Sequence, residues 1–245
     1  MKISLITVVY NARDTISKCI ESVIGQNYPD IEYIIIDGGS TDGTLQVIDQ
    51  YRPHIHIFIS EPDKGIYDAM NKGIALASGE IVGTLNADDF FVNEDVLSSV
   101  AAAFLAHETE IVYGNLHYVN PAGKVIRKWQ SAECGKNSFN WGFMPPHPTF
   151  YCRRYLFEKL GFYRLEYGSA GDYELMVRFM HKYHIKSHYL NTVMVKMQVG
   201  GVSNKNIINR FKAWSHDFKA MKTNGVGYPL FALTLKPLRK IFQFF

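Results

Sequence analysis

Apolar runs typical of β-strands alternate with amphipathic helical patterns four times in the first 107 residues. The runs are short and rich in β-branched residues, as expected of strands that are buried on both faces. They are ISLITVV (3–9), IEYIIID (31–37), HIHIFIS (54–60) and GEIVGTLN (79–86). Because a helix between successive strands makes them parallel, the chain is predicted to form an α/β fold with a mostly parallel central sheet, flanked by helices on both faces.

Polar residues follow each of these predicted strands. The segments at the strand ends are 10–11, 37–39, 61–64 and 86–89. In an open parallel sheet the carboxyl ends of the strands lie along one edge, and ligands bind there. The sequence therefore predicts that residues far apart in the chain converge on one site.

The pattern changes after residue 107. The predicted elements are a hairpin (110–130), a strand and short helix (147–161), a helix (170–183), two short strands (184–190 and 192–198) and a long helix (204–222). No low-complexity linker interrupts them, so residues 1–222 are predicted to form a single domain with halves 1–107 and 108–222. Residues 223–245 form a separate tail in this interpretation.

The composition excludes several classes of protein. With 245 residues and a formal net charge of +3, the chain offers no electrostatic argument for binding nucleic acid. Its three cysteines (19, 134 and 152) are scattered without a CxxC pair, so a disulfide framework and a zinc site are not expected, and a cytoplasmic location is the default. The N-terminus lacks the features of a signal peptide, and no run reaches the roughly 18 apolar residues of a membrane span.

Two adjacent carboxylates, Asp88 and Asp89, follow the fourth predicted strand, and Asn86 precedes them. Like charges so close repel, which favours protonation of one carboxylate or a shared cation. The turn after the first strand is neither GxGxxG nor a P-loop, so a phosphate group needs another partner. Asp88 and Asp89 are therefore predicted to bind Mg²⁺ or Mn²⁺ beside a diphosphate. An Asp pair after a strand is also typical of a simple turn and helix cap.

Three stretches of the chain resemble family 2 glycosyltransferases with the GT-A fold, of the inverting, bacterial polysaccharide type. They are ISLITVVYNARDTISKCIESVIGQNYPDIEYIIIDGGSTDGT, EPDKGIYDAMNKGIALASGEIVGTLNADD and SAGDYELMVR. The resemblance implies a Rossmann-like sheet with a nucleotide-sugar-binding half and a C-terminal acceptor-side segment. It also implies a metal-dependent, hexosyltransferase-type enzyme of cell-surface polysaccharide synthesis. Such an enzyme moves a sugar from a nucleoside-diphosphate sugar to a hydroxyl of a glycan or polyprenyl-linked acceptor.

The resemblance implies roles for single residues. Asp172 matches the general base of inverting members. Asp88 matches the final acid of the DxD motif, which binds metal and diphosphate, and Asn86 replaces the first acid of that motif. Asp37 matches the acid that accepts a hydrogen bond from the nucleobase. The other positions that match contacts to the nucleotide sugar are Thr7, Tyr10, Asn11, Gly38, Lys64, Asp68 and Asn71.

Four of the candidate residues also have structural interpretations that the sequence leaves open. Thr7 suits a buried strand, and Asp37 suits a turn former in its glycine-rich loop. Asp172 begins a helix, where the dipole favours an acid. His147 lies among prolines and suits either a structural role or contact with the acceptor or a metal.

Departures from the family pattern keep two other functions open. Met70 stands where many relatives carry Arg, and Lys64 or Lys72 is the candidate to replace that contact. With Asn86 in the DxD motif as well, a catalytically degenerate carbohydrate-binding protein is one alternative. A nucleotidyltransferase that makes nucleotide sugars is the other, although it normally has a Gly-rich basic loop after the first strand, where this chain has VYNARD.

The tail mixes apolar and aromatic bulk with Lys236, Arg239 and Lys240. This composition suits peripheral contact with the anionic inner face of the cell membrane, and a terminal helix packed on the domain is the alternative. Pro237 is predicted to break the tail into two short pieces. The glycine-containing segment 199–204 is predicted to close over the site.

Overall fold

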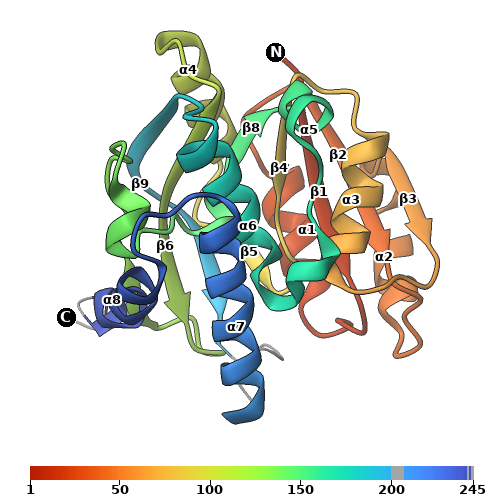
Figure 1. Ribbon diagram of the computed structural model, residues 1–245. Coiled ribbons are helices and arrows are strands. Elements are labelled where there is room, and N and C mark those ends of the chain that lie inside the picture. Colours follow the sequence, from red (N-terminus) through yellow and green to blue (C-terminus); the bar gives the residue numbers. More distant parts are fainter. Residues whose placement is uncertain (200–206, 242, 244–245) are drawn as a thin grey trace.

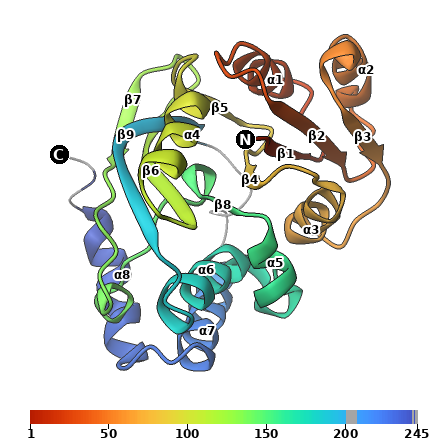
Figure 2. The same cartoon turned by 90° about the horizontal axis from the view of Figure 1, so that it is seen from above.

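The computed structural model describes residues 1–199, 207–241 and 243 (Figure 1). Within these residues, nine strands form one sheet in the order β3-β2-β1-β4-β8-β6-β9-β5, with β7 paired to β6. Helices lie on both sides of the sheet (Figure 2). The predicted α/β class, with a central sheet flanked by helices, is confirmed.

The first four strands of the sheet order run parallel, as predicted. They are β1 (Ile3–Val9), β2 (Ile31–Asp37), β3 (Ile57–Ser60) and β4 (Ile81–Thr84). Their connecting helices are α1 (Ile16–Ile24), α2 (Thr44–Asp49) and α3 (Ile66–Leu76). The register pairs Val9 with Asp37 and Asp37 with Ser60, so three strand ends meet at one edge of the sheet.

The remaining strands make the rest of the sheet mixed. They are β5 (Asp89–Phe91), β6 (Ile111–Val119), β7 (Val125–Trp129), β8 (Tyr151–Arg153) and β9 (Ser187–Gln198). The prediction of two strands over 184–198 was wrong, because β9 is continuous. The pairing of β9 with β6 shifts register between Tyr113 and Asn115 of β6, opposite the point where the sequence suggested a break between two strands. Strand β5 has three residues, too few to produce a periodic signal in the sequence.

The other helices follow β5 in the chain, and all of them except α4 lie after residue 107. They are α4 (Val96–Ala106), α5 (Tyr155–Leu160), α6 (Gly171–Met176) with a following π-helical turn (Val177–Lys182), α7 (Ile207–Thr223) and α8 (Pro229–Ile241). Most of the segment 199–204, predicted to close over the site, lies outside the described residues. Every helix in the described part of the chain is too short or too polar to cross a membrane.

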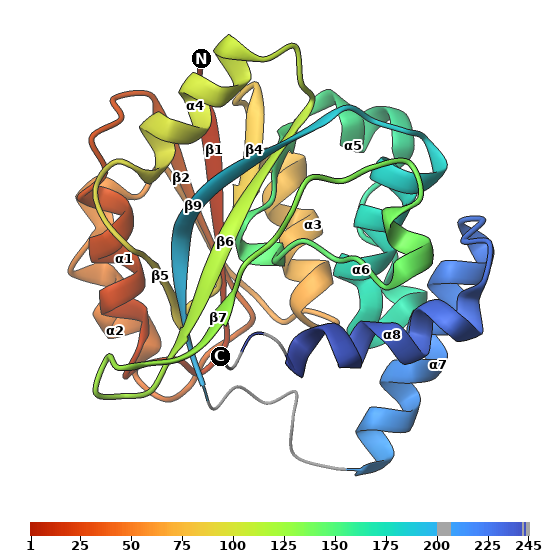
Figure 3. The ribbon, with the colours of Figure 1, turned by 90° about the vertical axis from the view of Figure 1, so that its left-hand side faces the viewer.

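Helix α8 contains Pro237, so the prediction that this residue breaks the tail was wrong. The helix lies beside α7 (Figure 3). Ala232 is fully buried, and the Lys236 ammonium lies 2.7 Å from the Asp217 carboxylate on α7. These contacts offset the backbone hydrogen bond that proline cannot donate.

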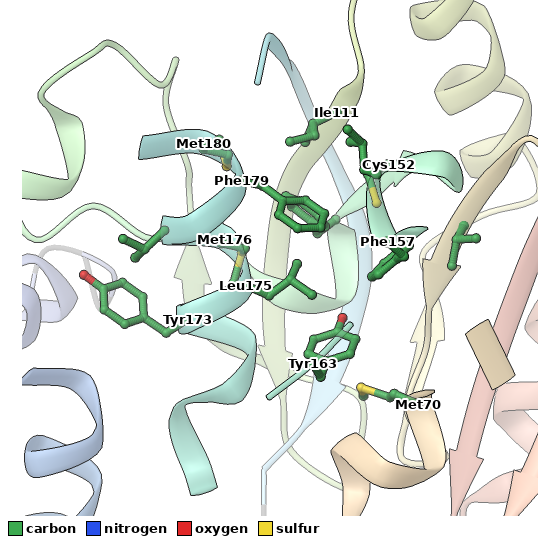
Figure 4. Close-up of a cluster of buried hydrophobic side chains, with 14 of the residues drawn as sticks. Met70, Ile111, Cys152, Phe157, Tyr163, Tyr173, Leu175, Met176, Phe179 and Met180 are labelled. Carbon is green, nitrogen blue, oxygen red and sulfur yellow. The ribbon is translucent and has the colours of Figure 1, made fainter. Parts of the chain in front are cut away.

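Two apolar clusters, one on each face of the sheet, form the core. Side chains alternate along β1, so Ile6 and Val8 join one cluster, whereas Leu5 and Val9 join the other. Figure 4 shows part of the first cluster, which includes Met70 from α3, Phe157 from α5 and Leu175 from α6. Met70 is fully buried, so a core residue occupies the position at which many relatives are expected to carry Arg.

Candidate active site

The end of β1 presents an exposed ring at the carboxyl edge of the sheet. The Tyr10 side chain is 65% exposed. Asn11 adopts a left-handed conformation (φ 48°), which asparagine tolerates better than most residues. The Asn11 N–H donates to Ser40 Oγ (2.8 Å), and Asn11 Oδ1 accepts from the Thr41 N–H (2.9 Å). These two bonds hold the loops after β1 and β2 together.

The Asp37 carboxylate is fully buried at the end of β2. Its Oδ2 accepts from the N–H groups of Gly39 and Ser40 (both 3.0 Å) and from Ser60 Oγ (2.7 Å), and its Oδ1 accepts from Ser40 Oγ (2.5 Å). These four bonds fix the loop after β2 and tie it to β3. These contacts agree with the interpretation of Asp37 as a turn former. They give no support to its predicted hydrogen bond with the nucleobase.

Thr7 lies in the core, away from the sheet edge. Its side chain is fully buried, and its hydroxyl lies 3.2 Å from the Tyr33 hydroxyl on β2. Thr7 therefore supports the strand pair β1–β2 and is not part of the exposed surface beside Tyr10.

The turn before α3 brings charged residues to the same edge. The Asp68 carboxylate, in the first turn of α3, accepts from the Lys64 N–H (3.0 Å). The Lys64 side chain is exposed. The Lys72 ammonium lies 2.7 Å from Glu61 and donates to the Pro62 carbonyl (3.1 Å). Of the two lysines proposed to replace the missing Arg, only Lys64 extends free of an acidic partner in the described part of the chain.

The half-buried Asn71 side chain is hydrogen-bonded to the backbone of Tyr163. Its side-chain amide donates to the Tyr163 carbonyl (2.8 Å), and its carbonyl oxygen accepts from the Tyr163 N–H (2.9 Å). This reciprocal pair fastens α3 to the segment after α5. Asn71 thus positions neighbouring residues, and its predicted contact with the nucleotide sugar stays a prediction.

The carboxylate pair after β4 is divided between two environments. Asp89 is fully buried, and burial, with the negative charge of Asp88 as a second cause, raises its pKa well above the usual range. Asp88 is partly exposed, and partial burial raises its pKa less far. The raised pKa disfavours a second negative charge beside Asp88, so protonation of Asp89 or a shared cation would stabilise this pair.

The surroundings of Asp88 suit a metal that also binds substrate phosphate. Within the described residues, no cluster of three or more His, Cys, Asp or Glu side chains is present. Asp88 Oδ atoms accept no side-chain hydrogen bond there, and Asn86 Oδ1 and Asp89 Oδ1 are buried without a partner. Carboxylate and amide oxygens are the ligand types of a hard cation whose other ligands are water and diphosphate.

The Asp172 carboxylate is held at the start of α6 by one of its oxygens. Oδ1 accepts from the Tyr67 hydroxyl (3.0 Å) and from the Tyr173 N–H (2.7 Å). Oδ2 receives no hydrogen bond from the described residues. Burial, and next the Asp172 charge, raise the pKa of Tyr67, so its hydroxyl stays protonated and donates. Gly171 permits this contact, because a Cβ there would lie 2.8 Å from the Tyr67 ring.

A second tyrosine and a histidine support Tyr67. The Tyr163 ring stacks on the Tyr67 ring at 5.4 Å between centroids, and its hydroxyl lies 2.8 Å from His147 Nε2. His147 is buried, and burial lowers its pKa, partly offset by the Asp172 charge. A neutral, enclosed His147 matches the structural interpretation of this residue. Tyr67 and Tyr163 were not singled out by the sequence, since spacing alone does not reveal contacts between distant segments.

A buried ion pair fixes the elements that carry Asp172 and Tyr163. Glu174 and Arg178 are both fully buried on the same helix, with 3.0 Å between Arg178 Nη2 and Glu174 Oε2. Arg178 also donates to the carbonyls of residues 160–162. Glu174 accepts from the Asn224 side-chain amide (3.2 Å). The pair therefore joins α6, the segment before Tyr163 and the end of α7.

The two acidic sites lie in one region of the molecule. Tyr118 on β6 has a pKa raised mainly by burial; the Arg127 charge opposes the shift, and the nearby negative charges of Asp89 and Asp172 add to it. The sheet thus brings together residues from the β4 end and the α6 start. A separate cavity of about 550 Å³ lies between the end of β7 and α8, and Lys128, Trp129, Phe143, Lys236 and Arg239 are among its lining residues.

Comparisons with known proteins agree with this arrangement. The family model described as "Glycosyl transferase family 2" matches residues 4–165. A PGL/p-HBAD biosynthesis glycosyltransferase of Mycobacterium tuberculosis is 30% identical over 218 residues, which cover 85% of this chain and 81% of the relative. The chondroitin synthase of Pasteurella multocida is 32% identical over 143 residues, 57% of this chain and 14% of that protein.

Two groups of solved structures share the fold. S. aureus TarS 1-349 in complex with UDP-GlcNAc superimposes with a TM-score of 0.71 at 19% identity, over 92% of this chain and 66% of that one. The mannosyltransferase PcManGT from Pyrobaculum calidifontis, in complex with GDP-Man and Mn²⁺, gives a TM-score of 0.68 at 18% identity, over 96% of this chain and 72% of that one. These neighbours confirm the GT-A fold.

Proposed function

The chain belongs to glycosyltransferase family 2, and from this premise we propose that it catalyses inverting transfer of a sugar from a nucleoside-diphosphate sugar to an acceptor hydroxyl. The proposed acceptor is a glycan or polyprenyl-linked glycan of cell-surface polysaccharide synthesis. One observation carries the proposal: Asp172 is fastened through Oδ1 alone, in the same region as the carboxylate pair after β4.

Asp172 acts as general base in this proposal. A base must hold one geometry and keep an oxygen free to take a proton. The Tyr67 hydroxyl and the Tyr173 N–H fix Oδ1, and Oδ2 remains to accept the proton of the acceptor hydroxyl as that oxygen attacks the anomeric carbon. Because Tyr67 comes from the donor-side half, its bond to Asp172 aligns the base with the donor.

The exposed Tyr10 ring, the Asn11 loop and the Lys64 side chain are proposed to receive the nucleoside diphosphate. Two structural neighbours were solved in complex with UDP-GlcNAc and with GDP-Man, which supports a nucleotide sugar as donor. These two ligands carry different bases, so they do not select one for this chain.

Asp88 and Asn86 are proposed to hold Mg²⁺ or Mn²⁺. Asp89, which the sequence predicted as the second ligand, is fully buried and is proposed to position Asn86 instead. The complex of one structural neighbour with Mn²⁺ supports this assignment, as do the unpartnered oxygens of Asn86 and Asp89. When bound, the cation neutralises charge on the departing nucleoside diphosphate. Buried Asp89 accepts from the Asn86 side-chain amide (3.2 Å) and so orients the Asn86 oxygen.

Replacing Asp88 by asparagine is expected to remove the effect of metal on nucleotide binding. For the unmodified protein, nucleoside diphosphate at 100 times its Kd with Mn²⁺ is expected to stabilise the fold by about 2.7 kcal/mol, and much less with a chelator. Thermal unfolding with Mn²⁺ or chelator measures the difference. Asp49→Asn, the same change at an exposed position on α2, serves as control. A metal effect that persists in Asp88→Asn would move the metal elsewhere.

The tail is proposed to contact the inner face of the cell membrane peripherally. Leu230 and Leu238 on α8 are 69% and 51% exposed, while Ala232 and Lys236 fasten the helix to the domain. The cavity beside α8 has basic residues and no acidic residue among those that line it, which suits an anionic, lipid-linked acceptor.

Changing Leu230 and Leu238 together to glutamine is expected to weaken binding to anionic vesicles by about 10-fold, because exposed apolar area drives interfacial binding. The fold is expected to be unaffected, since neither side chain is buried. Co-sedimentation with phosphatidylserine vesicles at low salt measures the loss. If the unmodified protein does not sediment with these vesicles, the membrane assignment fails.

A panel of nucleotide sugars tests the proposed function. With Mn²⁺ and water as acceptor, slow release of a nucleoside diphosphate is expected from at least one donor. Release or exchange of pyrophosphate would indicate a nucleotidyltransferase instead. Binding of saccharides without turnover of any donor would indicate a carbohydrate-binding protein and contradict the proposal.

A further inference from the structure

Asp63 places a free carboxylate oxygen at the carboxyl edge of the sheet. The residue lies in the turn between β3 and α3 and is partly exposed. Its Oδ1 accepts from the Gly65 N–H (2.7 Å), which fixes the direction of the carboxylate. Its Oδ2 receives no hydrogen bond from the part of the chain that the structure describes. A fixed carboxylate with one unused oxygen is an acceptor prepared for a ligand N–H.

Gly38 creates the space that this carboxylate occupies. A Cβ added at Gly38 would lie 2.4 Å from Asp63 Oδ2 and 3.4 Å from Cδ2 of the Tyr10 ring. Any side chain at position 38 would therefore collide with the Asp63 carboxylate. The absence of one brings the free oxygen of Asp63 and the exposed ring of Tyr10 to the same place, although they come from different strand ends.

Asp37, the acid at this edge that the sequence predicted to bind the base, is occupied. Asp37 is fully buried, and its two oxygens already accept four hydrogen bonds from the loop after β2 and from Ser60. A nucleobase that approached Asp37 would have to displace bonds that hold the loop. Asp63 offers an acceptor in the same neighbourhood without this cost.

We propose that Asp63 reads the nucleobase of the donor and selects uracil or thymine, with the base lying against Tyr10. This inference rests on the proposed function. A uracil or thymine ring presents a single N3–H between two carbonyl oxygens, which matches one free carboxylate oxygen. Cytosine and adenine present a ring-nitrogen acceptor there, which a carboxylate repels. Guanine presents two adjacent donors and fits a carboxylate with both oxygens free, whereas Oδ1 of Asp63 is engaged by Gly65.

Binding of UDP, dTDP, CDP and GDP to the full-length protein with Mn²⁺, followed by calorimetry, tests the assignment. The unmodified protein is expected to bind UDP and dTDP at least about 10-fold more tightly than CDP or GDP. In Asp63→Asn, the amide retains the bond to Gly65 but offers N–H donors to the base. UDP affinity is expected to fall by about 10- to 100-fold, the range for a lost hydrogen bond to a charged group, with CDP bound at least as well as before.

Two further variants keep the test decisive. In Gly38→Ala, the new Cβ displaces the Asp63 carboxylate, and UDP affinity is expected to fall in the same range although Asp63 is present. Asp49→Asn is expected to bind all four nucleotides as the unmodified protein does. Preference for GDP, or an unchanged preference for UDP in Asp63→Asn, would overturn this inference and leave the proposed function standing. Failure of every nucleotide to bind the unmodified protein would overturn both.

Discussion

Replacing Asp172 by asparagine is expected to lower turnover of the donor by about 10²–10⁴-fold, the usual contribution of a positioned general base. Donor affinity is expected to change little, because the asparagine side chain can still accept from Tyr67 and Tyr173, and no donor contact is assigned to Asp172. Steady-state release of nucleoside diphosphate and calorimetric donor binding measure the two quantities separately. The prediction depends on the free Oδ2, which the amide replaces with a group that cannot take a proton.

Tyr67→Phe separates positioning from proton transfer. The change removes the hydroxyl that donates to Asp172 Oδ1 and keeps the stacked ring against Tyr163. Turnover is expected to fall by about 10-fold, a smaller loss than in Asp172→Asn, with donor affinity and unfolding temperature nearly unchanged. If Asp172→Asn instead unfolds the protein or abolishes donor binding, Asp172 is only a helix cap and the assignment of the base is wrong.

Replacing Arg178 by methionine is expected to lower the free energy of unfolding by about 3–5 kcal/mol, because it leaves the buried Glu174 carboxylate without its main partner. The same change removes the donors to the carbonyls of residues 160–162, which precede Tyr163. Urea unfolding at equilibrium measures the loss. The double variant Glu174→Gln with Arg178→Met is expected to recover part of it, since no unpaired charge then remains in the interior.

The stabilities of the single and double variants show whether the ion pair between Glu174 and Arg178 is needed. Recovery would show that most of the cost of Arg178→Met is the unpaired Glu174 charge. A single variant as stable as the unmodified protein would mean that Arg164 and Asn224, the other contacts of Glu174, are sufficient partners. In that case the pair does not hold the elements around Asp172 and Tyr163 together.

Local patterns of apolar residues were sufficient to predict the strands of the donor-side half. Continuous β-branched runs predicted β1 and β2 with the observed bounds, and parallel pairing then places their carboxyl ends at one edge. The same patterns do not say which way a side chain points in a strand buried on both faces. Both Thr7 and Asp37 lie in the first stretch that resembles the family. The Thr7 side chain lies in the core, and the Asp37 carboxylate accepts hydrogen bonds from its own loop.

Contacts between distant segments account for what the sequence did not predict. The Tyr67 hydroxyl reaches Asp172 across 105 positions, and no periodicity links the two. The role proposed for Asp63 depends on the missing side chain at Gly38, and only the structure shows that these two residues are neighbours. The helical conformation around Pro237 also depends on a distant contact, because α8 packs against α7 although proline disfavours the interior of a helix.

The stereochemistry of donor cleavage tests the central claim most directly. Time-resolved proton NMR can follow the sugar released by the unmodified protein from an α-linked nucleoside-diphosphate sugar. A single attack by an oxygen activated at Asp172 predicts that the β anomer is released first and converts to the equilibrium mixture afterwards. Initial release of the α anomer would contradict an inverting reaction and with it the role proposed for Asp172.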